Sequence, residues 1–163
     1  MNSFKDFKFS KNIISLVTFA NDPLGLSYLA PYSAMTIAEY FKDQGIETLV
    51  VFDDLGTHAK VYREISLLCE RFPGRNSYPS DIFFTHSKLL ERAGNFKTKS
   101  KNVSITCLPL VESVGGDLSG YVQTNLMSMT DGHIFFDIDM YNQGVRPAIN
   151  YFLSVTRVGR QTQ

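Results

Sequence analysis

Three apolar runs that contain no charged side chain constrain the fold more than any other feature of this sequence. They cover residues 13–19, 48–52 and 103–111, and each is rich in β-branched residues. A strand that is apolar at nearly every position has no polar face to turn toward water, which is typical of parallel sheets covered on both faces. We therefore expect these residues to form strands of a sheet that lies between helical layers.

Helical patterns separate the apolar runs. Pro31 suits the first turn of a helix that continues to about residue 44, and Gly45 provides its stop. Further helices are predicted over residues 57–70, 78–93 and 121–129, and further strands over residues 134–136 and 153–157. Strands that alternate with helices define the α/β class with a mostly parallel sheet.

Length and charge exclude some functions. The 163 residues suit one domain, and we divide them into an N-terminal extension (residues 1–12) and the domain proper (residues 13–163). Sixteen Lys and Arg residues balance sixteen Asp and Glu residues, so nucleic acid is not an expected partner. No apolar run reaches the roughly 18 residues that a membrane-spanning helix needs, so direct membrane insertion is not expected either.

Asp53 directly follows the apolar run 48–52. Nucleotide-binding sheets hold Mg²⁺ with an acidic side chain at this edge, although many such residues only cap the next helix, as we expect for Asp54. The usual phosphate cradle, GxxxxGK followed by Ser or Thr, is absent from the sequence. Either the chain does not bind nucleotides, or the cradle lies on another polypeptide.

Short segments spread in order along the chain resemble the alpha subunit of the rotary (F-type) ATP synthase. They are residues 28–33 (YLAPYS), 52–55 (FDDL), 73–79 (PGRNSYP), 86–93 (HSKLLERA), 116–119 (GDLS), 128–132 (SMTDG), 144–150 (GVRPAIN) and 153–159 (LSVTRVG). The resemblance is collinear from Phe19 to Gly159 and implies the later half of a RecA-like P-loop NTPase domain, without its phosphate-loop strand.

The resemblance implies a catalytic group. Arg157 matches the family's arginine finger, which reaches the γ-phosphate held by the neighbouring beta subunit, and Ser154 and Ser128 match interface serines near that site. A planar guanidinium delivered in trans stabilises the negative charge of phosphoryl transfer. From the residues alone, an Arg after an apolar strand is most often a surface ion-pair partner, and Ser154 is an ordinary strand-end hydroxyl.

The resemblance also implies a nucleotide-binding group. Arg146, Pro147 and Tyr141 match the stretch beside the adenine of ATP or ADP in the alpha subunit's own non-catalytic site, and Asp53 matches the carboxylate near its Mg²⁺. Tyr141 replaces a phenylalanine of the family. Two other departures are His133, where the family has Gln, and Gly56-Thr57-His58, which replaces a Ser-Lys-Gln stretch.

The family's N-terminal barrel, phosphate loop and C-terminal helical bundle have no counterpart in the sequence. We therefore expect a fragment of a split alpha subunit, completed by other alpha-subunit fragments that carry the phosphate loop and the C-terminal helices. Its further partners would be beta subunits and, through the assembled head, the gamma subunit. The expected location is the matrix side of the mitochondrial inner membrane, as a peripheral component, with no activity of the chain alone. Two alternatives are a stand-alone binding module derived from this domain and an independent small ATPase, which the missing cradle argues against.

Overall fold

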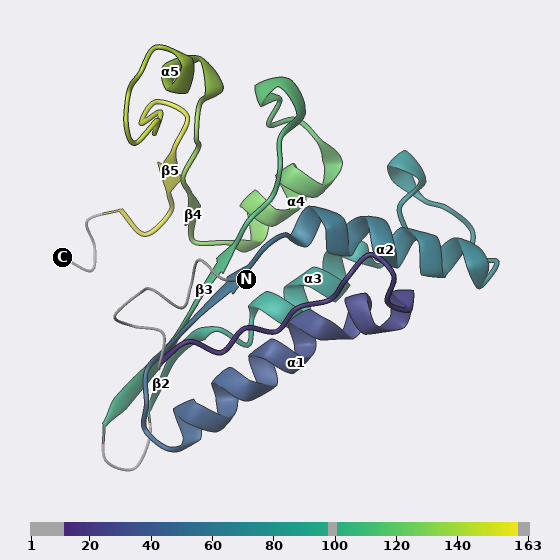
Figure 1. Ribbon diagram of the computed structural model, residues 1–163, viewed down its shortest axis with the longest axis horizontal. Coiled ribbons are helices and arrows are strands. Elements are labelled where there is room, and N and C mark those ends of the chain that lie inside the picture. The colour runs from purple at the N-terminus through teal and green to yellow at the C-terminus, as the bar shows by residue number, and fades with distance from the viewer. Residues whose placement is uncertain (1–11, 98–100, 160–163) are drawn as a thin grey trace.

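The computed structural model describes residues 12–97 and 101–159. It shows a three-stranded sheet with helices packed on one face, and a small ribbon-and-helix part beyond one end of the sheet (Figure 1). The predicted N-terminal extension lies outside the described residues, apart from residue 12. Because helices alternate with the strands of the larger sheet, the α/β class is confirmed.

The larger sheet has the order β1-β3-β2. β1 (Thr48–Phe52) and β3 (Asn102–Pro109) are parallel, with Val50 opposite Cys107. β2 (Gly94–Lys97) pairs with β3 in the antiparallel direction. The first strand has the predicted bounds, whereas β2 forms where no strand was predicted, because Gly94 to Lys97 fold back on β3.

Five α-helices lie within the described residues: α1 (Leu24–Asp43), α2 (Leu55–Leu68), α3 (Ile82–Leu90), α4 (Tyr121–Met129) and α5 (Ile138–Asn142). Single 3₁₀ turns occur at Arg75–Ser77 and Val114–Gly116. α4 has the predicted bounds. α1 begins before the predicted start, so Pro31 stands inside the helix rather than in its first turn.

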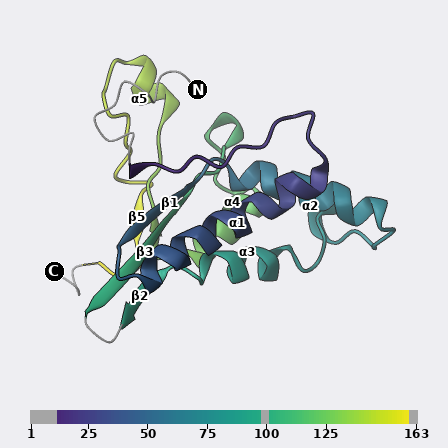
Figure 2. The same ribbon diagram turned by 60° about the horizontal axis from the view of Figure 1, so that its bottom comes forward.

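One face of the larger sheet carries the core. α1 runs alongside β1 and β3 in both views (Figures 1 and 2). Because side chains alternate between the two faces of a strand, Val50 and Phe52 on β1 and Ile105 on β3 all turn to this side. They are buried together with Met35 of α1 and Leu89 of α3. This layer of helices against the sheet is the hydrophobic core of the chain.

The opposite face of the larger sheet is open. Leu49 and Val51 on β1 are 63% and 53% exposed. Leu108 on β3, which lies opposite Val51, is 47% exposed. The prediction that both faces of the run 48–52 are covered is therefore wrong within the described residues. No helix among residues 12–97 and 101–159 lies over the apolar side chains of this second face.

The apolar run at residues 13–19 is the second correction. The described residues of this run form no strand, and Ile14 and Phe19 are both 62% exposed. A strand exists only when a neighbouring strand accepts and donates its backbone hydrogen bonds, and among the described residues this run bonds only to Asp22, in the turn that follows it. The run therefore lies as an extended segment before α1 (Figure 1).

A small antiparallel ribbon joins β4 (Gly132–His133) and β5 (Val155–Thr156). The predicted strand at 134–136 is displaced, since the ribbon begins at Gly132 and residue Phe136 makes only a single bridge, to Ile149. A Cβ at position 132 would lie 2.6 Å from the carbonyl oxygen of Val155. Only glycine allows the two strands to approach this closely.

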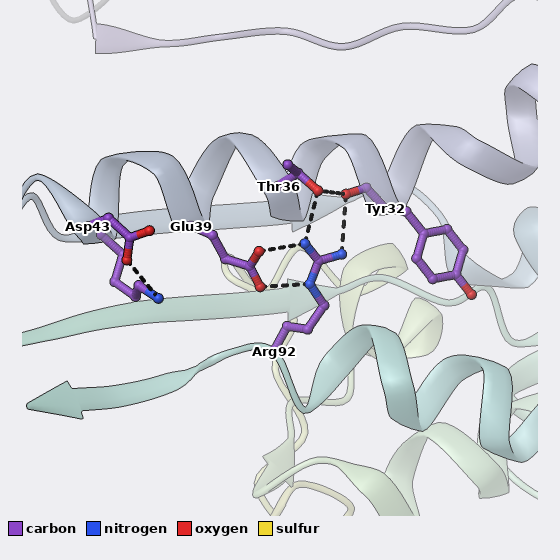
Figure 3. Close-up of polar contacts among 6 residues, drawn as sticks. Tyr32, Thr36, Glu39, Asp43 and Arg92 are labelled. Carbon is purple, nitrogen blue, oxygen red and sulfur yellow. Dashed lines mark hydrogen bonds and ion pairs between the residues drawn. The ribbon is translucent and has the colours of Figure 1, made fainter.

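Arg92, which follows α3, fastens that helix to α1 (Figure 3). Its Nε and Nη2 atoms each donate to one carboxylate oxygen of Glu39 at 2.7 Å, and Nη2 also donates to the hydroxyl of Thr36 at 2.9 Å. Both side chains of the ion pair are about a third exposed or less. The hydrogen bonds from Arg92 hold the pKa of Glu39 below its ordinary value.

Candidate functional site

A hollow of about 320 Å³ lies between the end of α4 and the β4–β5 ribbon. Its lining comes from both elements: Thr124, Met127, Ser128, Gly132, His133, Val155 and Arg157. Two of the three residues predicted for the catalytic group, Ser128 and Arg157, are therefore brought together here from positions far apart in the sequence.

Backbone carbonyls hold the side chain of Arg157. Nη1 donates to the carbonyl oxygen of Ser128 at 2.7 Å and Nη2 donates to that of Met127 at 3.1 Å. The last carbonyls of a helix have no partner inside the helix and carry a partial negative charge, which suits a guanidinium. The amide N–H of Arg157 also donates to the carbonyl oxygen of Asp131. The end of α4 therefore fixes the guanidinium at the hollow, where it stays exposed to solvent.

The two predicted serines differ in their surroundings. The hydroxyl of Ser128 donates to the carbonyl oxygen of Asn125 on its own helix, and the residue is exposed. The hydroxyl of Ser154 donates to the carbonyl oxygen of Asn150 at 2.6 Å and accepts from the amide of Phe135. Ser154 thus stabilises the connection between the ribbon strands and does not line the hollow.

The residues predicted to lie beside adenine are also neighbours in the structure. The guanidinium of Arg146 lies over the ring of Tyr141, 3.5 Å from its centroid. Nη1 of Arg146 donates to the carbonyl oxygens of Tyr141 and Val145. Pro147 follows directly, and all of the predicted residues in this group are exposed. They form one cationic and aromatic surface on the last turn of α5 and the segment that follows it.

The two adjacent carboxylates at the end of β1 have different environments. Asp54 accepts a hydrogen bond from the amide of Thr57 and caps α2, as predicted. Asp53 is exposed, and its carboxylate makes no hydrogen bond or ion pair with another described residue. Among the described residues, no cluster of three or more His, Cys, Asp or Glu side chains could hold a metal ion.

Sequence reasoning missed the part that His133 plays in this hollow. Its Nε2 donates to the carbonyl oxygen of Leu153 at 2.8 Å, which ties β4 to the start of the segment that carries Arg157. The substitution of His for the family's Gln at this position was visible in the sequence, but the contact with a carbonyl so far away in the chain was not. Thr124 and Met127 were missed because nothing local in the sequence marks them.

The parallel β1–β3 pair, its helical layer and the arginine beside a hollow define a partial nucleotide-binding domain of the RecA-like α/β type. Residues 1–156 match the family model described as the ATP synthase alpha/beta family, nucleotide-binding domain. The chain belongs to the ATP synthase alpha/beta family.

Similar proteins place the chain with the alpha subunits of that family. It is 49% identical to ATP synthase subunit alpha of Aquifex aeolicus (strain VF5) over 148 residues, which are 91% of this chain and 29% of that protein. It is 48% identical to the subunit alpha of Wigglesworthia glossinidia brevipalpis, over 100% of this chain and 34% of that protein. It is also 49% identical to the subunit alpha of Ehrlichia ruminantium (strain Gardel), over 92% of this chain and 30% of that protein. The chain thus spans about a third of the length of these bacterial relatives.

Proposed function

We propose that this chain works as part of an alpha subunit in the catalytic head of a proton-translocating ATP synthase. In that role it supplies Arg157 to the catalytic site of a neighbouring beta subunit, where ATP forms from ADP and phosphate. The observation that carries the proposal is the family match over residues 1–156, combined with a solvent-exposed guanidinium fixed at the rim of a hollow.

The surroundings of Arg157 support the role of a finger. The guanidinium is bound by carbonyl oxygens only, so no carboxylate among the described residues neutralises its charge. An arginine reserved for a partner's phosphate must stay positively charged and accessible, and a planar fork of N–H donors suits the oxygens of a transferring phosphoryl group. Ser128 and Ser154 act by shaping its support, through the α4 carbonyl and the ribbon connection.

The second part of the proposal is a share of a non-catalytic ATP or ADP site. Arg146, Tyr141 and Pro147 offer a flat cationic and aromatic surface of the kind on which an adenine ring stacks. Asp53 fits the part of one Mg²⁺ ligand, because its carboxylate is exposed at the carboxyl end of β1 and bonded to no other described residue. Mg²⁺ is typically held by one or two carboxylates, several waters and the phosphates of the nucleotide. When bound, the ion would neutralise phosphate charge.

The third part concerns partners and location. The open face of β1 and β3 supports completion of the domain by further polypeptide, which we propose to be alpha-subunit fragments carrying the phosphate loop and the C-terminal helices. Beta subunits, and the gamma subunit through the assembled head, are the other proposed partners. A divided subunit of this kind would fit a mitochondrion, with the chain peripheral on the matrix side of the inner membrane. Within the described residues, no helix has the length and apolar character needed to cross a bilayer.

The decisive experiment replaces Arg157 in the assembled complex. Arg157→Ala should lower turnover about 10³–10⁵-fold, the range found for arginine fingers, while the chain still co-purifies with beta subunits. Arg157→Lys should also be strongly impaired, because an ammonium cannot offer the planar fork. Lys60→Ala, at an exposed position on α2, is the matched control and should keep full turnover. Unchanged turnover in Arg157→Ala would refute the finger role.

A second experiment distinguishes the synthase component from a stand-alone module. The native complex is purified through its beta subunit, and its polypeptides are identified by mass spectrometry. We expect this chain in the complex in stoichiometric amounts, together with fragments that carry the phosphate loop. A complex that contains a full-length alpha subunit and lacks this chain would contradict the proposed function.

A further inference from the structure

Two buried imidazoles connect α1, α2 and α3, the three helices that pack together on the core side of the sheet. His58 on α2 is 4% exposed and His86 on α3 is 1% exposed. Nδ1 of His58 lies 3.1 Å from Nε2 of His86, and Nε2 of His58 lies 3.1 Å from the carbonyl oxygen of Tyr28 on α1. A continuous line of hydrogen bonds therefore runs from α3 through α2 to α1.

The hydrogen-bond partners fix where the protons lie. A carbonyl oxygen only accepts, so Nε2 of His58 must carry the proton that it donates to Tyr28. In a neutral imidazole the other nitrogen is then bare, and Nδ1 of His58 accepts from an N–H at Nε2 of His86. When both rings are neutral, these contacts thus place the proton of each ring on Nε2.

Aromatic rings surround the pair on the side of α1 and α2. The ring of Tyr28 is stacked on His58, with centroids 5.2 Å apart, and the ring of Tyr32 meets His58 edge-on at 6.1 Å. Tyr62 on α2 is stacked on Tyr28 at 5.3 Å. These rings exclude water from the imidazoles and offer no anionic group to either of them.

The charged groups nearby are already paired with other residues. Asp81 accepts from the hydroxyl of Tyr62 and forms an ion pair with Arg71. Arg92 donates to the carbonyl oxygen of Tyr32 and to Glu39, and the hydroxyl of Tyr32 donates to Thr85 on α3. Among the described residues, no carboxylate bonds to His58 or His86. An imidazolium formed here would therefore be a buried cation without a counter-charge.

Burial acts on both imidazoles in the same direction. It lowers the pKa of His58, and it lowers the pKa of His86 to about 4, where the charge of His58 contributes as a second cause. A first proton can bind at the bare Nδ1 of His86, which keeps both hydrogen bonds but creates the buried cation. A second proton would place two N–H donors against each other and break the bond.

We propose that the His58–His86 pair is an acid-sensitive latch, which holds α1, α2 and α3 together while both rings are neutral and releases them on protonation. His58 stands in the Gly56-Thr57-His58 stretch that departs from the family's Ser-Lys-Gln. The effect of the latch on the protein is a loss of stability in mildly acidic solution. This inference does not depend on the proposed role in ATP synthesis.

The sign of the effect follows from the protons bound in each state. The unfolded chain binds protons on both imidazoles near their ordinary pKa of about 6.5, while the folded chain resists them. The stabilisation is therefore fully present above about pH 6.5 and is lost as the pH falls below it. Each such group changes the unfolding equilibrium constant by up to about tenfold per pH unit, so two groups give up to about 100-fold.

The test follows the urea-induced unfolding of the full chain between pH 7.5 and pH 5. His58→Gln is the informative variant, because a glutamine amide donates to Tyr28 and accepts from His86 without titrating. Near pH 5.5 the unfolding equilibrium constant rises with each unit of pH decrease. For His58→Gln the factor of this rise should be about ten times smaller than for the wild type. His133→Gln, outside the latch, is the matched control and should follow the wild type. Equal acid dependence of His58→Gln and the wild type would overturn the proposal.

A second measurement covers the case in which His58→Gln does not fold. Nitrogen-15 NMR of the wild-type imidazoles reads the tautomers directly, and a pH titration follows their protonation. We expect two rings with the proton on Nε2 that stay neutral at pH 5.5, and their protonation at lower pH should coincide with loss of contacts between α1 and α3. Two rings that titrate freely near pH 6.5 in the folded chain would equally overturn the latch.

Discussion

At the scale of single residues, Asp53 and Asp54 show how position decides what a carboxylate does. Asp54 accepts the amide proton of Thr57 at 2.6 Å, which satisfies one of the unpaired donors at the start of α2. Asp53, one residue earlier, faces solvent and makes no hydrogen bond with the described residues. Asp54 therefore stabilises the fold, whereas Asp53 remains available for the proposed Mg²⁺ site.

This difference gives a matched pair of variants. Asp54→Ala should lower the free energy of unfolding by about 1 kcal/mol, the usual cost of removing a helix cap. Asp53→Ala should change it by less than about 0.5 kcal/mol, as expected for an exposed side chain without partners. Urea unfolding followed by circular dichroism measures both. Equal losses of unfolding free energy in the two variants would mean that the cap made by Asp54 does not stabilise the protein.

Some residue roles could be predicted from the sequence and others could not. The cap at Asp54 was predictable, because capping depends on residues within one helical turn. The contacts of His133 with Leu153, and of Arg157 with the end of α4, join residues 20 to 30 positions apart. No local pattern encodes such contacts, so only the family resemblance pointed to Arg157, and nothing pointed to its carbonyl support.

At the scale of elements, one ion pair is among the contacts that link α1 to the segment just after α3. Arg92 and Glu39 share two hydrogen bonds of 2.7 Å and are partly buried. By contrast, Lys42 and Asp43 are neighbours on α1, and Asp43 is 72% exposed in their contact. Figure 3 shows both pairs, of which only the first joins α1 to another segment of the chain.

A double-mutant cycle should separate the two pairs. Replacing Arg92 and Glu39 by Ala, singly and together, should give a coupling energy of about 1 kcal/mol, because the geometry is bidentate and the surroundings exclude part of the water. Asp43→Ala should change the free energy of unfolding by less than about 0.5 kcal/mol. The coupling should vanish as acid protonates Glu39, whose pKa is lowered in the folded chain. If the two single variants lower the free energy of unfolding at pH 7 by amounts that add up to the effect of the double variant, Arg92 and Glu39 do not stabilise each other.

The elements themselves differ in how far the sequence determines them. β1 and α4 have their predicted bounds, since a short apolar run and a short helical pattern depend mainly on local sequence. The run at residues 13–19 has the same apolar, β-branched character as β1 but forms no strand among the described residues. A strand needs a partner backbone, and a single segment cannot specify whether that partner is at hand. β2 shows the converse, a polar segment made into a strand by its neighbour.

At the scale of the whole molecule, the larger sheet has one core face and one open face. Leu49, Val51 and Leu108 on the open face are each about half exposed or more. On the core face of the same strands, Val50, Phe52, Val103 and Ile105 are buried. Parallel sheets are normally covered on both faces. The open face is therefore the part of this chain best suited to the polypeptide that completes the domain in the proposed assembly.

Charges placed on this face should prevent assembly without unfolding the chain. Burying a side chain such as Leu or Val contributes about 1.5–3 kcal/mol, so Leu49→Lys and Val51→Lys should each weaken association at least about tenfold. Leu68→Lys, at a position on α2 that is 73% exposed and away from the sheet, is the matched control. The measured quantity is the fraction of each variant that co-purifies with the beta subunit, relative to wild type, with circular dichroism of the free chain as the folding check. If the two sheet variants enter the complex as well as Leu68→Lys does, the completing polypeptide does not bind over this face, although Arg157 could still serve the catalytic site.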